Sequence, residues 1–191
     1  MNKIVGIVGL PGSGKNYVCD LLANTDSTNV KVIDVDEITH KVLDQSVKEI
    51  RNNFGDAVFL DGKLDRKLLF EAFRNDPAKA GRHLAMVVPR IKKIVFQESQ
   101  NAENADITYL NCPFLFEYVF DVYCYEIWLI TASFETRLER VKRRGWDEAE
   151  LKRRDAKFLP VEVLREKCDK IIVNEGTKED IKTIIRRETC F

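Results

Sequence analysis

The sequence lacks the features that mark disulfide-rich, zinc-binding and membrane-spanning proteins. Its five cysteines are odd in number and scattered, and no two form a C-x-x-C pair, which argues against a disulfide framework and a zinc site. The most apolar stretch, residues 109–132, contains a proline and three acidic residues, so it does not qualify as a membrane span. No charged-then-apolar leader opens the chain. We therefore expect no membrane partner and a location in the reducing cytoplasm.

The sequence also lacks an excess of charge of either sign. Its 31 basic and 31 acidic residues give a formal net charge of zero, so no overall field attracts nucleic acid. At 191 residues and 45% hydrophobic content, the chain is long enough for one domain with a sizeable core. No internal repeat, low-complexity tract or linker divides it. We expect a single domain over residues 1–191, a monomer or a weak homo-oligomer, without a nucleic acid partner.

A glycine-rich turn between a strand pattern and a helix pattern is the most informative stretch. Residues 4–8 form an apolar run typical of a buried strand, residues 17–23 have helical spacing, and residues 9–16 between them read Gly-Leu-Pro-Gly-Ser-Gly-Lys-Asn. In a phosphate-binding loop the glycines let backbone N–H groups point at a phosphate, the helix N-terminus adds partial positive charge, and the lysine reaches the terminal phosphates. The pattern predicts a nucleoside triphosphate as ligand.

One position of this loop departs from the usual pattern. Asn16 stands where Ser or Thr would offer Mg²⁺ a hydroxyl, although an asparagine oxygen can still face a metal as a neutral ligand. The alternative is an ordinary glycine turn without phosphate. The residues expected to bind nucleotide here are Pro11, Gly12, Ser13, Gly14, Lys15 and Asn16.

Apolar runs alternate with helix patterns along the rest of the chain. We expect four further strands, at residues 29–33, 106–110, 126–130 and 170–173. Helices are expected at residues 37–43, 47–54, 65–73, from 76, 91–101, 133–142, 147–157, 160–166 and 177–187, with a break or kink at Pro89. Continuous apolar strands alternating with helices predict an α/β fold whose parallel sheet is covered on both faces.

In such a sheet the ligand lies beyond the carboxyl ends of the strands. The phosphate loop, Asp34 and Asp36, residues 111–117 and the segment from Thr131 are therefore expected to converge. Asp34 could hold Mg²⁺ through water or simply end its strand. Asp36 could take part in catalysis or cap the helix that follows it.

Several motifs together resemble the dephospho-CoA kinase family. Besides residues 9–16, they are Val-Ile-Asp-Val-Asp-Glu-Ile at 32–38, Phe-Gly at 54–55, Leu-Asp-Gly-Lys-Leu-Asp-Arg at 60–66, Leu-Asn-Cys-Pro-Phe-Leu-Phe-Glu at 110–117 and Asp-Lys-Ile-Ile-Val-Asn-Glu-Gly at 169–176. The resemblance implies a three-layer P-loop kinase fold with a five-stranded parallel sheet. It further implies a helical acceptor-binding insertion at approximately 45–105 and a lid at approximately 137–158.

The same resemblance implies a reaction and a set of roles. The reaction is transfer of the γ-phosphate of ATP, with Mg²⁺, to the ribose 3′-hydroxyl of dephospho-CoA. Asp36 is implied as the base that orients the hydroxyl and accepts its proton, a role typically worth about 10²- to 10⁴-fold in rate. From the residues and the resemblance together, the other expected roles are catalysis by Lys15, Arg140 and Arg144, metal binding by Asn16 and Asp34, nucleotide binding by Asn174 and Gly176, and acceptor binding by Asp36, Lys63, Arg66 and Glu117.

The arginines belong to a dense basic stretch. Arg137, Arg140 and Arg144 have the i, i+3, i+7 spacing of one helix face, where guanidinium groups could close over ATP phosphates. The alternative is a solvated face balanced by nearby glutamates. We favour Arg140 and Arg144 as the clamp. Of the two histidines, we expect a surface or packing role for His40 and exposure to solvent for His83.

Three residues depart from the family pattern, and they leave alternative functions open. Asn16 replaces the usual Ser, Asn111 stands where Asp is usual, and Val88 stands where His is usual. One alternative is a related small-molecule or (deoxy)nucleoside monophosphate kinase. Another is a catalytically weak ATP-binding regulatory protein, because Asn16 and Asn111 remove usual ligands of magnesium.

Overall fold

The computed structural model describes residues 3–24, 29–101 and 105–189. The chain divides into two compact units. We call the described residues up to Asp34 and from Ser99 onward the sheet unit, and Val35–Glu98 the helical unit. No helix within the described ranges is both long and apolar enough to cross a membrane.

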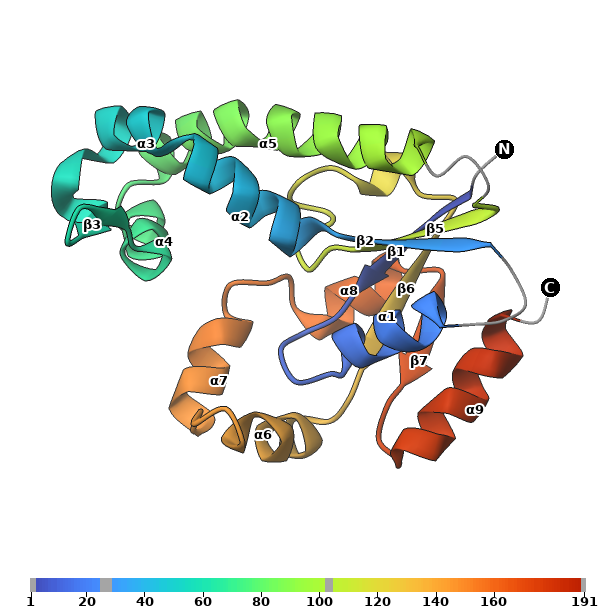
Figure 1. Ribbon diagram of the computed structural model, residues 1–191. Coiled ribbons are helices and arrows are strands. Elements are labelled where there is room, and N and C mark those ends of the chain that lie inside the picture. Colours follow the sequence, from blue (N-terminus) through green and yellow to red (C-terminus); the bar gives the residue numbers. More distant parts are fainter. Residues whose placement is uncertain (1–2, 25–28, 102–104, 190–191) are drawn as a thin grey trace. The chain divides into compact units, whose positions relative to one another are not determined.

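The sheet unit is built on a five-stranded parallel sheet with the order β2-β5-β1-β6-β7 (Figure 1). Its strands are β1 (Lys3–Val8), β2 (Val30–Asp34), β5 (Ile107–Asn111), β6 (Glu126–Thr131) and β7 (Lys170–Val173). All four pairings are parallel. The predicted α/β fold with five parallel strands is confirmed.

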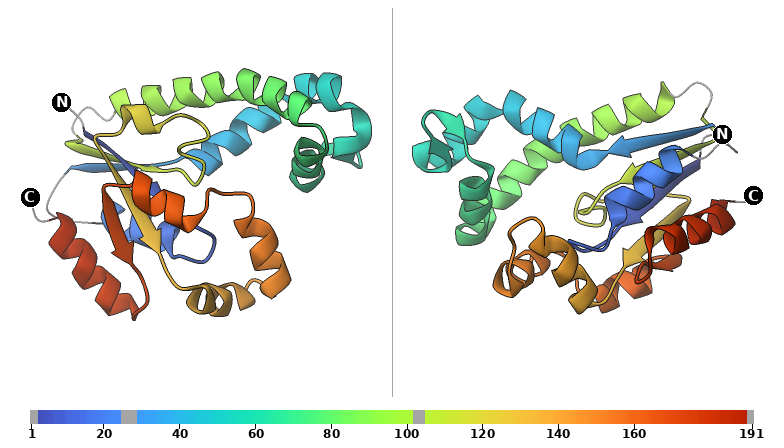
Figure 2. Two further views of the ribbon diagram at one scale, coloured as in Figure 1. Left: turned by 180° about the vertical axis from the view of Figure 1, so that it is seen from behind. Right: turned by 60° about the horizontal axis from the view of Figure 1, so that its bottom comes forward.

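Helices cover both faces of this sheet. The helices of the sheet unit are α1 (Lys15–Ala23), α6 (Phe134–Lys142), α7 (Glu148–Asp155), α8 (Val161–Lys167) and α9 (Lys178–Thr189), with a short 3₁₀ helix at Asp121–Tyr123. Helices α1 and α9 lie on one side of the sheet and α8 lies on the other (Figure 2). Two of the helices begin as the sequence predicts, because Ser133 and Asp147 accept hydrogen bonds from the backbone N–H groups of Thr136 and Glu150.

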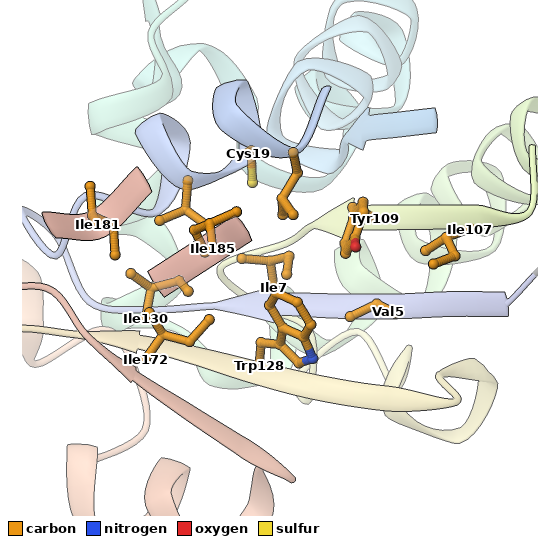
Figure 3. Close-up of a cluster of buried hydrophobic side chains, with 12 residues drawn as sticks. Val5, Ile7, Cys19, Ile107, Tyr109, Trp128, Ile130, Ile172, Ile181 and Ile185 are labelled. Atoms are coloured by element: carbon orange, nitrogen blue, oxygen red, sulfur yellow. The ribbon is translucent and has the colours of Figure 1, made fainter. Parts of the chain in front are cut away.

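The core of the sheet unit lies between the strands and helices α1 and α9 (Figure 3). Trp128 and Tyr109 pack edge to face at its centre, with ring centroids 5.7 Å apart. On the other face, Leu115 of the segment after β5 lies against Gly6, where an added Cβ would come within 2.5 Å of the leucine side chain. Strands β5 and β6 are buried on both faces along almost their whole length and are mostly apolar rather than alternating, whereas the edge strand β7 exposes Ile171 and Val173.

The helical unit contains four helices and a small hairpin. Its elements are α2 (Val35–Gln45), α3 (Val47–Phe54), a 3₁₀ helix (Gly55–Val58), β3 (Phe59–Leu60), β4 (Lys63–Leu64), α4 (Arg66–Asn75) and α5 (Pro77–Gln100), whose last two residues belong to the sheet unit. The sequence predicts the turn at Asp61 and Gly62 but not the two strands. Both turn residues have positive φ, +49° and +76°, as hairpin turns require.

Helix α5 corrects the expectation of a break at Pro89. The helix is continuous through this proline (Figure 1). An internal proline removes one hydrogen bond and costs about 3 kcal/mol. On both sides of it, however, a stripe at spacing of four residues is buried, formed by His83, Val87, Ile91 and Val95. Burial of this stripe along one helical face offsets the local cost.

His83 is a second correction, because it is buried rather than exposed to solvent. Its side chain is 1% exposed and packs against the rings of Phe54 and Phe73, with centroids 5.7 and 5.2 Å away. Neither ring nitrogen has a hydrogen-bond partner among the described residues. The place of His83 in the apolar stripe of α5 was readable from its spacing to Val87. Burial lowers the pKa of His83 to about 4.

Because His83 is buried without a hydrogen-bond partner among the described residues, we expect acid to destabilise the folded protein. Since the pKa is lowered from 6.5 to about 4 on folding, the unfolded chain binds more protons between these values, and the free energy of unfolding falls as the pH falls through that window. We expect His83 to account for a loss of about 3 kcal/mol between pH 7 and pH 4. Urea unfolding of the parent and of His83→Phe at both pH values measures the difference.

The exposed His40 provides the control for this measurement. His40→Asn is expected to keep the pH dependence of the parent, while His83→Phe loses the part between pH 6.5 and 4. Equal pH dependence in the parent and His83→Phe would contradict the assignment.

Candidate functional site

The carboxyl edge of the sheet brings polar residues of neighbouring strands together. Asn111, the last residue of β5, pairs in register with Ile7 of β1 on one side and with Asp34 of β2 on the other. The glycine-rich loop follows β1 directly. The loop, Asp34 and Asn111 therefore lie together at this edge of the sheet, as the sequence predicts.

The loop has the conformation that an anion site requires. Gly12 and Gly14 adopt φ of +81° and +91°, the left-handed region that glycine tolerates. Gly14 caps α1 without any side-chain hydrogen bond, and no acidic residue lies in the first turn of that helix. The N-terminal end of α1 thus keeps its positive dipole and carries Lys15 as its first residue. These features fit the phosphates of a nucleotide.

The glycines of the loop are also required by crowding. A Cβ on Gly9 would lie 2.5 Å from the Ile130 carbonyl oxygen, and one on Gly12 would lie 2.9 Å from that of Arg137. A Cβ on Gly14 would overlap the side-chain amide of Asn174. The backbone of the loop is therefore packed closely against β6, α6 and the end of β7.

Lys15 belongs to a chain of hydrogen bonds across the strand ends. Its ammonium group donates to Asn111 Oδ1, and Asn111 Nδ2 donates to Asp34 Oδ2 at 2.9 Å. Lys15 is 8% exposed and Asn111 is 3% exposed. The sequence marked Asn111 only as a departure from the family pattern, and its contact with Lys15 was not foreseen.

Arg140 and Asn174 bind the carbonyl groups of the loop. The Asn174 side chain donates to the Ser13 carbonyl oxygen at 2.8 Å. Arg140 Nη2 donates to the Asn174 carbonyl oxygen at 2.9 Å, and Arg140 Nη1 lies 3.4 Å from the carbonyl oxygens of Gly12 and Ser13. Both predicted site residues therefore lie at the loop, where they bind its carbonyl groups.

Arg137 makes a third connection to the loop. Its Nη1 donates to the Pro11 carbonyl oxygen at 3.1 Å, and its two terminal nitrogens form a paired contact with the Asp155 carboxylate, each bond 2.8 Å long. Arg137 is 6% exposed. The basic stretch pointed to this residue, but the sequence gave no means of pairing it with Asp155, the last residue of α7.

Arg144 does not share the helix face expected for it. Helix α6 ends at Lys142, and the chain then turns at Gly145, whose φ is +74°. Arg144 consequently lies beyond the helix and is exposed, with its guanidinium 5.7 Å from the centre of the Trp146 ring. The i, i+3, i+7 alignment thus holds only for Arg137 and Arg140. Helical spacing failed here because a left-handed glycine ends the helix.

The segment that follows β7 is hydrogen-bonded to the start of α6. Glu175 accepts hydrogen bonds from the Thr136 hydroxyl at 2.6 Å and from the backbone N–H of Ser133. These bonds lower the pKa of the Glu175 carboxyl. Gly176 is exposed, and a Cβ there would lie 2.6 Å from Asp180 Oδ2. Of the two predicted nucleotide-binding residues after β7, Asn174 and Gly176, it is Asn174 that contacts the loop.

The possible metal ligands are few. Within the described part of the chain, no group of three or more His, Cys, Asp or Glu side chains is arranged to hold a metal ion. Asp34 supplies one carboxylate at the strand ends, and Asn16 is exposed in the first turn of α1. Mg²⁺ is commonly held by one or two carboxylates together with nucleotide phosphates. These residues therefore fit a metal ion that is bound with its nucleotide.

The remaining predicted residues are distributed over both units. Glu117 of the sheet unit is exposed, yet partial desolvation raises the pKa of its carboxyl. In the helical unit, Asp36 and Lys63 are exposed, and Arg66 donates to both oxygens of Asp44 at 2.9 and 3.0 Å. Because α2 begins at Val35, Asp36 lies inside the first helical turn. The alternative role as a helix cap for Asp36 is therefore wrong.

Substitution of Gly14 tests the packed loop. Gly14→Ala is expected to lower the free energy of unfolding by more than the 1–2 kcal/mol that a left-handed alanine usually costs, because the new Cβ also overlaps Asn174. We expect ATP affinity to fall at least about tenfold, equivalent to about 1.4 kcal/mol. Thermal unfolding and calorimetric titration with ATP measure the two effects.

Gly145→Ala is the matched control for the unfolding measurement. Gly145 has a similar φ of +74°, but no atom lies within 4 Å of the position of its Cβ. It is expected to show the backbone cost alone. If both variants lost the same stability, the contact between Gly14 and Asn174 would have no energetic role.

Comparison with known proteins gives one consistent result. The model of the dephospho-CoA kinase family matches residues 3–180. A dephospho-CoA kinase of Thermus thermophilus is 29% identical over 184 residues, which cover 96% of this chain and 88% of that protein. A crystal structure from Thermus thermophilus has a TM-score of 0.86 at 28% identity and covers 100% of this chain and 99% of its own. The fold is also that of the dephospho-CoA kinase from Campylobacter jejuni, with a TM-score of 0.67 at 20% identity over 98% of this chain and 96% of that one.

Proposed function

We propose that this chain, which belongs to the dephospho-CoA kinase family, transfers the γ-phosphate of ATP to the ribose 3′-hydroxyl of dephospho-CoA to give coenzyme A. The observation that carries the proposal is the phosphate loop at the carboxyl edge of the sheet, with Lys15 at the start of α1 and Asp34 and Asn111 beside it. The family match favours this reaction over a nucleoside monophosphate kinase or an inactive ATP-binding protein.

The chemistry of phosphoryl transfer gives each part of the loop a role. Little covalent assistance is needed, so positioning and charge stabilisation dominate. The backbone N–H groups of residues 12–16 bind the phosphates, and Lys15 stabilises charge on the transferred group. Arg140 stabilises the conformation of the loop through contacts with the carbonyl groups of Gly12 and Ser13. Arg144 remains a candidate for a direct contact with phosphate. Asp36 accepts the proton of the attacking hydroxyl.

Magnesium enters this proposal together with ATP. Asp34 and Asn16 would hold it, and it would supply positive charge that offsets the negative charge of the phosphates. Mg²⁺ is commonly held by one or two protein carboxylates together with substrate phosphates, and Asp34 would supply one carboxylate here. The presence of Asn16 in place of a hydroxyl therefore changes one ligand without excluding the metal.

Acceptor binding is assigned to the approximate insertion 45–105 and nucleotide closure to the approximate lid 137–158. Lys63 and Arg66 have the charge to bind acceptor phosphates, and Glu117 can accept a hydrogen bond from the acceptor. The backbone at Asn174 and Gly176 would hold the adenine of ATP. We further propose that the protein is a monomer or a weak homo-oligomer that binds no nucleic acid.

A cytoplasmic location accords with the cysteine chemistry. Cys19, Cys112, Cys124 and Cys168 are free thiols. Burial raises the pKa of Cys19, Cys124 and Cys168 to about 12 in each case, so these three remain protonated at neutral pH. Such thiols serve packing rather than cross-linking.

An acceptor panel tests the proposed reaction. ADP formation would be followed with Mg²⁺ and ATP in the presence of dephospho-CoA, of AMP, of dTMP, or of no acceptor. We expect turnover with dephospho-CoA alone. Turnover with a nucleoside monophosphate would support the alternative kinase, and ATP binding without turnover on any acceptor would support the regulatory alternative.

A further inference from the structure

Asn111 has both ends of its side-chain amide bound to charged groups of the site. Its oxygen accepts from the Lys15 ammonium group, and its nitrogen donates to the Asp34 carboxylate at 2.9 Å. The side chain is buried at the end of β5, in register between β1 and β2. It therefore has little freedom to reorient.

The two charged partners determine the orientation of the amide. With the amide reversed, its NH₂ group would face an ammonium group and its oxygen would face a carboxylate, and both contacts would be repulsive. The side-chain amide of asparagine can accept a hydrogen bond from a cation with its oxygen and donate one to an anion with its nitrogen at the same time. A carboxylate at position 111 could accept from Lys15 but could not donate to Asp34.

We propose that Asn111 is a positioning residue for phosphoryl transfer. Its neutral amide oxygen accepts a hydrogen bond from Lys15 until nucleotide binds, and the nucleotide phosphates then replace that oxygen as the acceptor. This inference rests on the proposed function, since it concerns the binding of ATP to the same loop. Lys15 is buried and needs an acceptor before nucleotide arrives. The bond from the Lys15 ammonium to Asn111 has one ionised partner, whereas a bond to a carboxylate would have two and would add the attraction between opposite charges. A neutral amide oxygen holds Lys15 in place, and a phosphate competes with it more readily than with a carboxylate.

The first test replaces the neutral acceptor with a charged one of the same shape. Asn111→Asp is expected to weaken ATP binding about tenfold when measured by calorimetry with ATP in EDTA, so that no metal ion compensates the new charge. Asn111→Ser keeps a neutral oxygen at this position and is expected to bind ATP within about threefold of the parent. Thermal unfolding establishes that each variant is folded.

A charge swap separates the position of the carboxylate from the total charge of the site. The double variant Asn111→Asp, Asp34→Asn has the same net charge as the parent, but Lys15 still meets a carboxylate. We expect its ATP affinity to remain about tenfold weakened.

The possible outcomes are distinct. Parent-like affinity in Asn111→Asp, or recovery of affinity in the charge swap, would overturn the proposal, because only the total charge would then matter. If Asn111→Asp does not fold, the comparison of Asn111→Ser with Asn111→Ala decides, since only serine supplies an acceptor; equal affinity in these two would overturn it. ATP binding is measured without acceptor, so a failure of the dephospho-CoA reaction would leave this result unaffected and would be recognised separately.

Discussion

Replacing Asp36 by asparagine is expected to lower kcat by about 10²- to 10⁴-fold while leaving the affinity for ATP unchanged. In the proposed reaction, the attacking hydroxyl loses its proton as the bond to phosphorus forms. A carboxylate can orient that hydroxyl and accept the proton, whereas a carboxamide of the same size cannot accept it. Steady-state kinetics with dephospho-CoA and calorimetric titration with ATP separate the two quantities.

Glu37 supplies a matched control for this substitution. It is exposed in the same first turn of α2 as Asp36 and forms an ion pair with Lys41 at 3.1 Å. Glu37→Gln removes an equal charge from the same helix end, where an acidic residue is worth about 0.3–1 kcal/mol. Its kcat is expected to stay within about threefold of the parent. An Asp36→Asn variant as active as Glu37→Gln would remove Asp36 from the mechanism.

Replacing Arg137 by alanine is expected to lower the free energy of unfolding by about 3 kcal/mol, because it leaves the partly buried Asp155 carboxylate without its paired partner. The Pro11 carbonyl of the phosphate loop loses its donor in the same variant. The effect lies at the low end of the usual range for broken buried pairs, since the Asp155 side chain is 21% exposed. Urea unfolding measures the stability, and ATP titration measures the effect on the loop.

Two further variants control for the loss of an arginine as such. Arg143→Ala removes an exposed arginine at the end of the same helix and is expected to change stability by no more than about 0.5 kcal/mol. The double variant Arg137→Met, Asp155→Leu replaces the pair by apolar side chains and is expected to lie within about 1 kcal/mol of the parent. A stability of Arg137→Ala equal to that of Arg143→Ala would show that the buried pair contributes nothing.

The sheet and the phosphate loop could be predicted because their signals are local. Continuous apolar runs identify fully covered strands, and each strand end lies within about one residue of its expected position. The caps Ser133, Asp147 and Asp65 act through backbone groups only two or three residues away. For such features the sequence contains both partners within one turn of helix.

The contacts that hold the loop could not be predicted in the same way, because they join residues far apart in the chain. Asn111 lies 96 residues from Lys15, and Asn174 lies 161 residues from Ser13. Arg137 was not favoured over Arg140 and Arg144, because its partner Asp155 lies 18 residues further along the chain. The roles of Asp36, Lys63, Arg66 and Glu117 stay predictions, since they concern bound acceptor.

His83 and Pro89 show where local rules gave the wrong answer. A histidine is a polar residue and suggests exposure, and a proline suggests a break or kink in a helix. In α5 the apolar stripe at every fourth residue outweighs both, since it buries one face of the helix on either side of Pro89. Weighing the periodicity above the single residues would have corrected both expectations.

The fate of a labelled γ-phosphate tests the central claim most directly. The chain would be incubated with Mg²⁺, ATP labelled with ³²P at the γ-position and dephospho-CoA, and the product would be treated with a 3′-nucleotidase. We predict that the label appears in coenzyme A and is released as phosphate by that enzyme. Label that stays in ATP, or that enters the product at a position resistant to the 3′-nucleotidase, would contradict the proposed reaction.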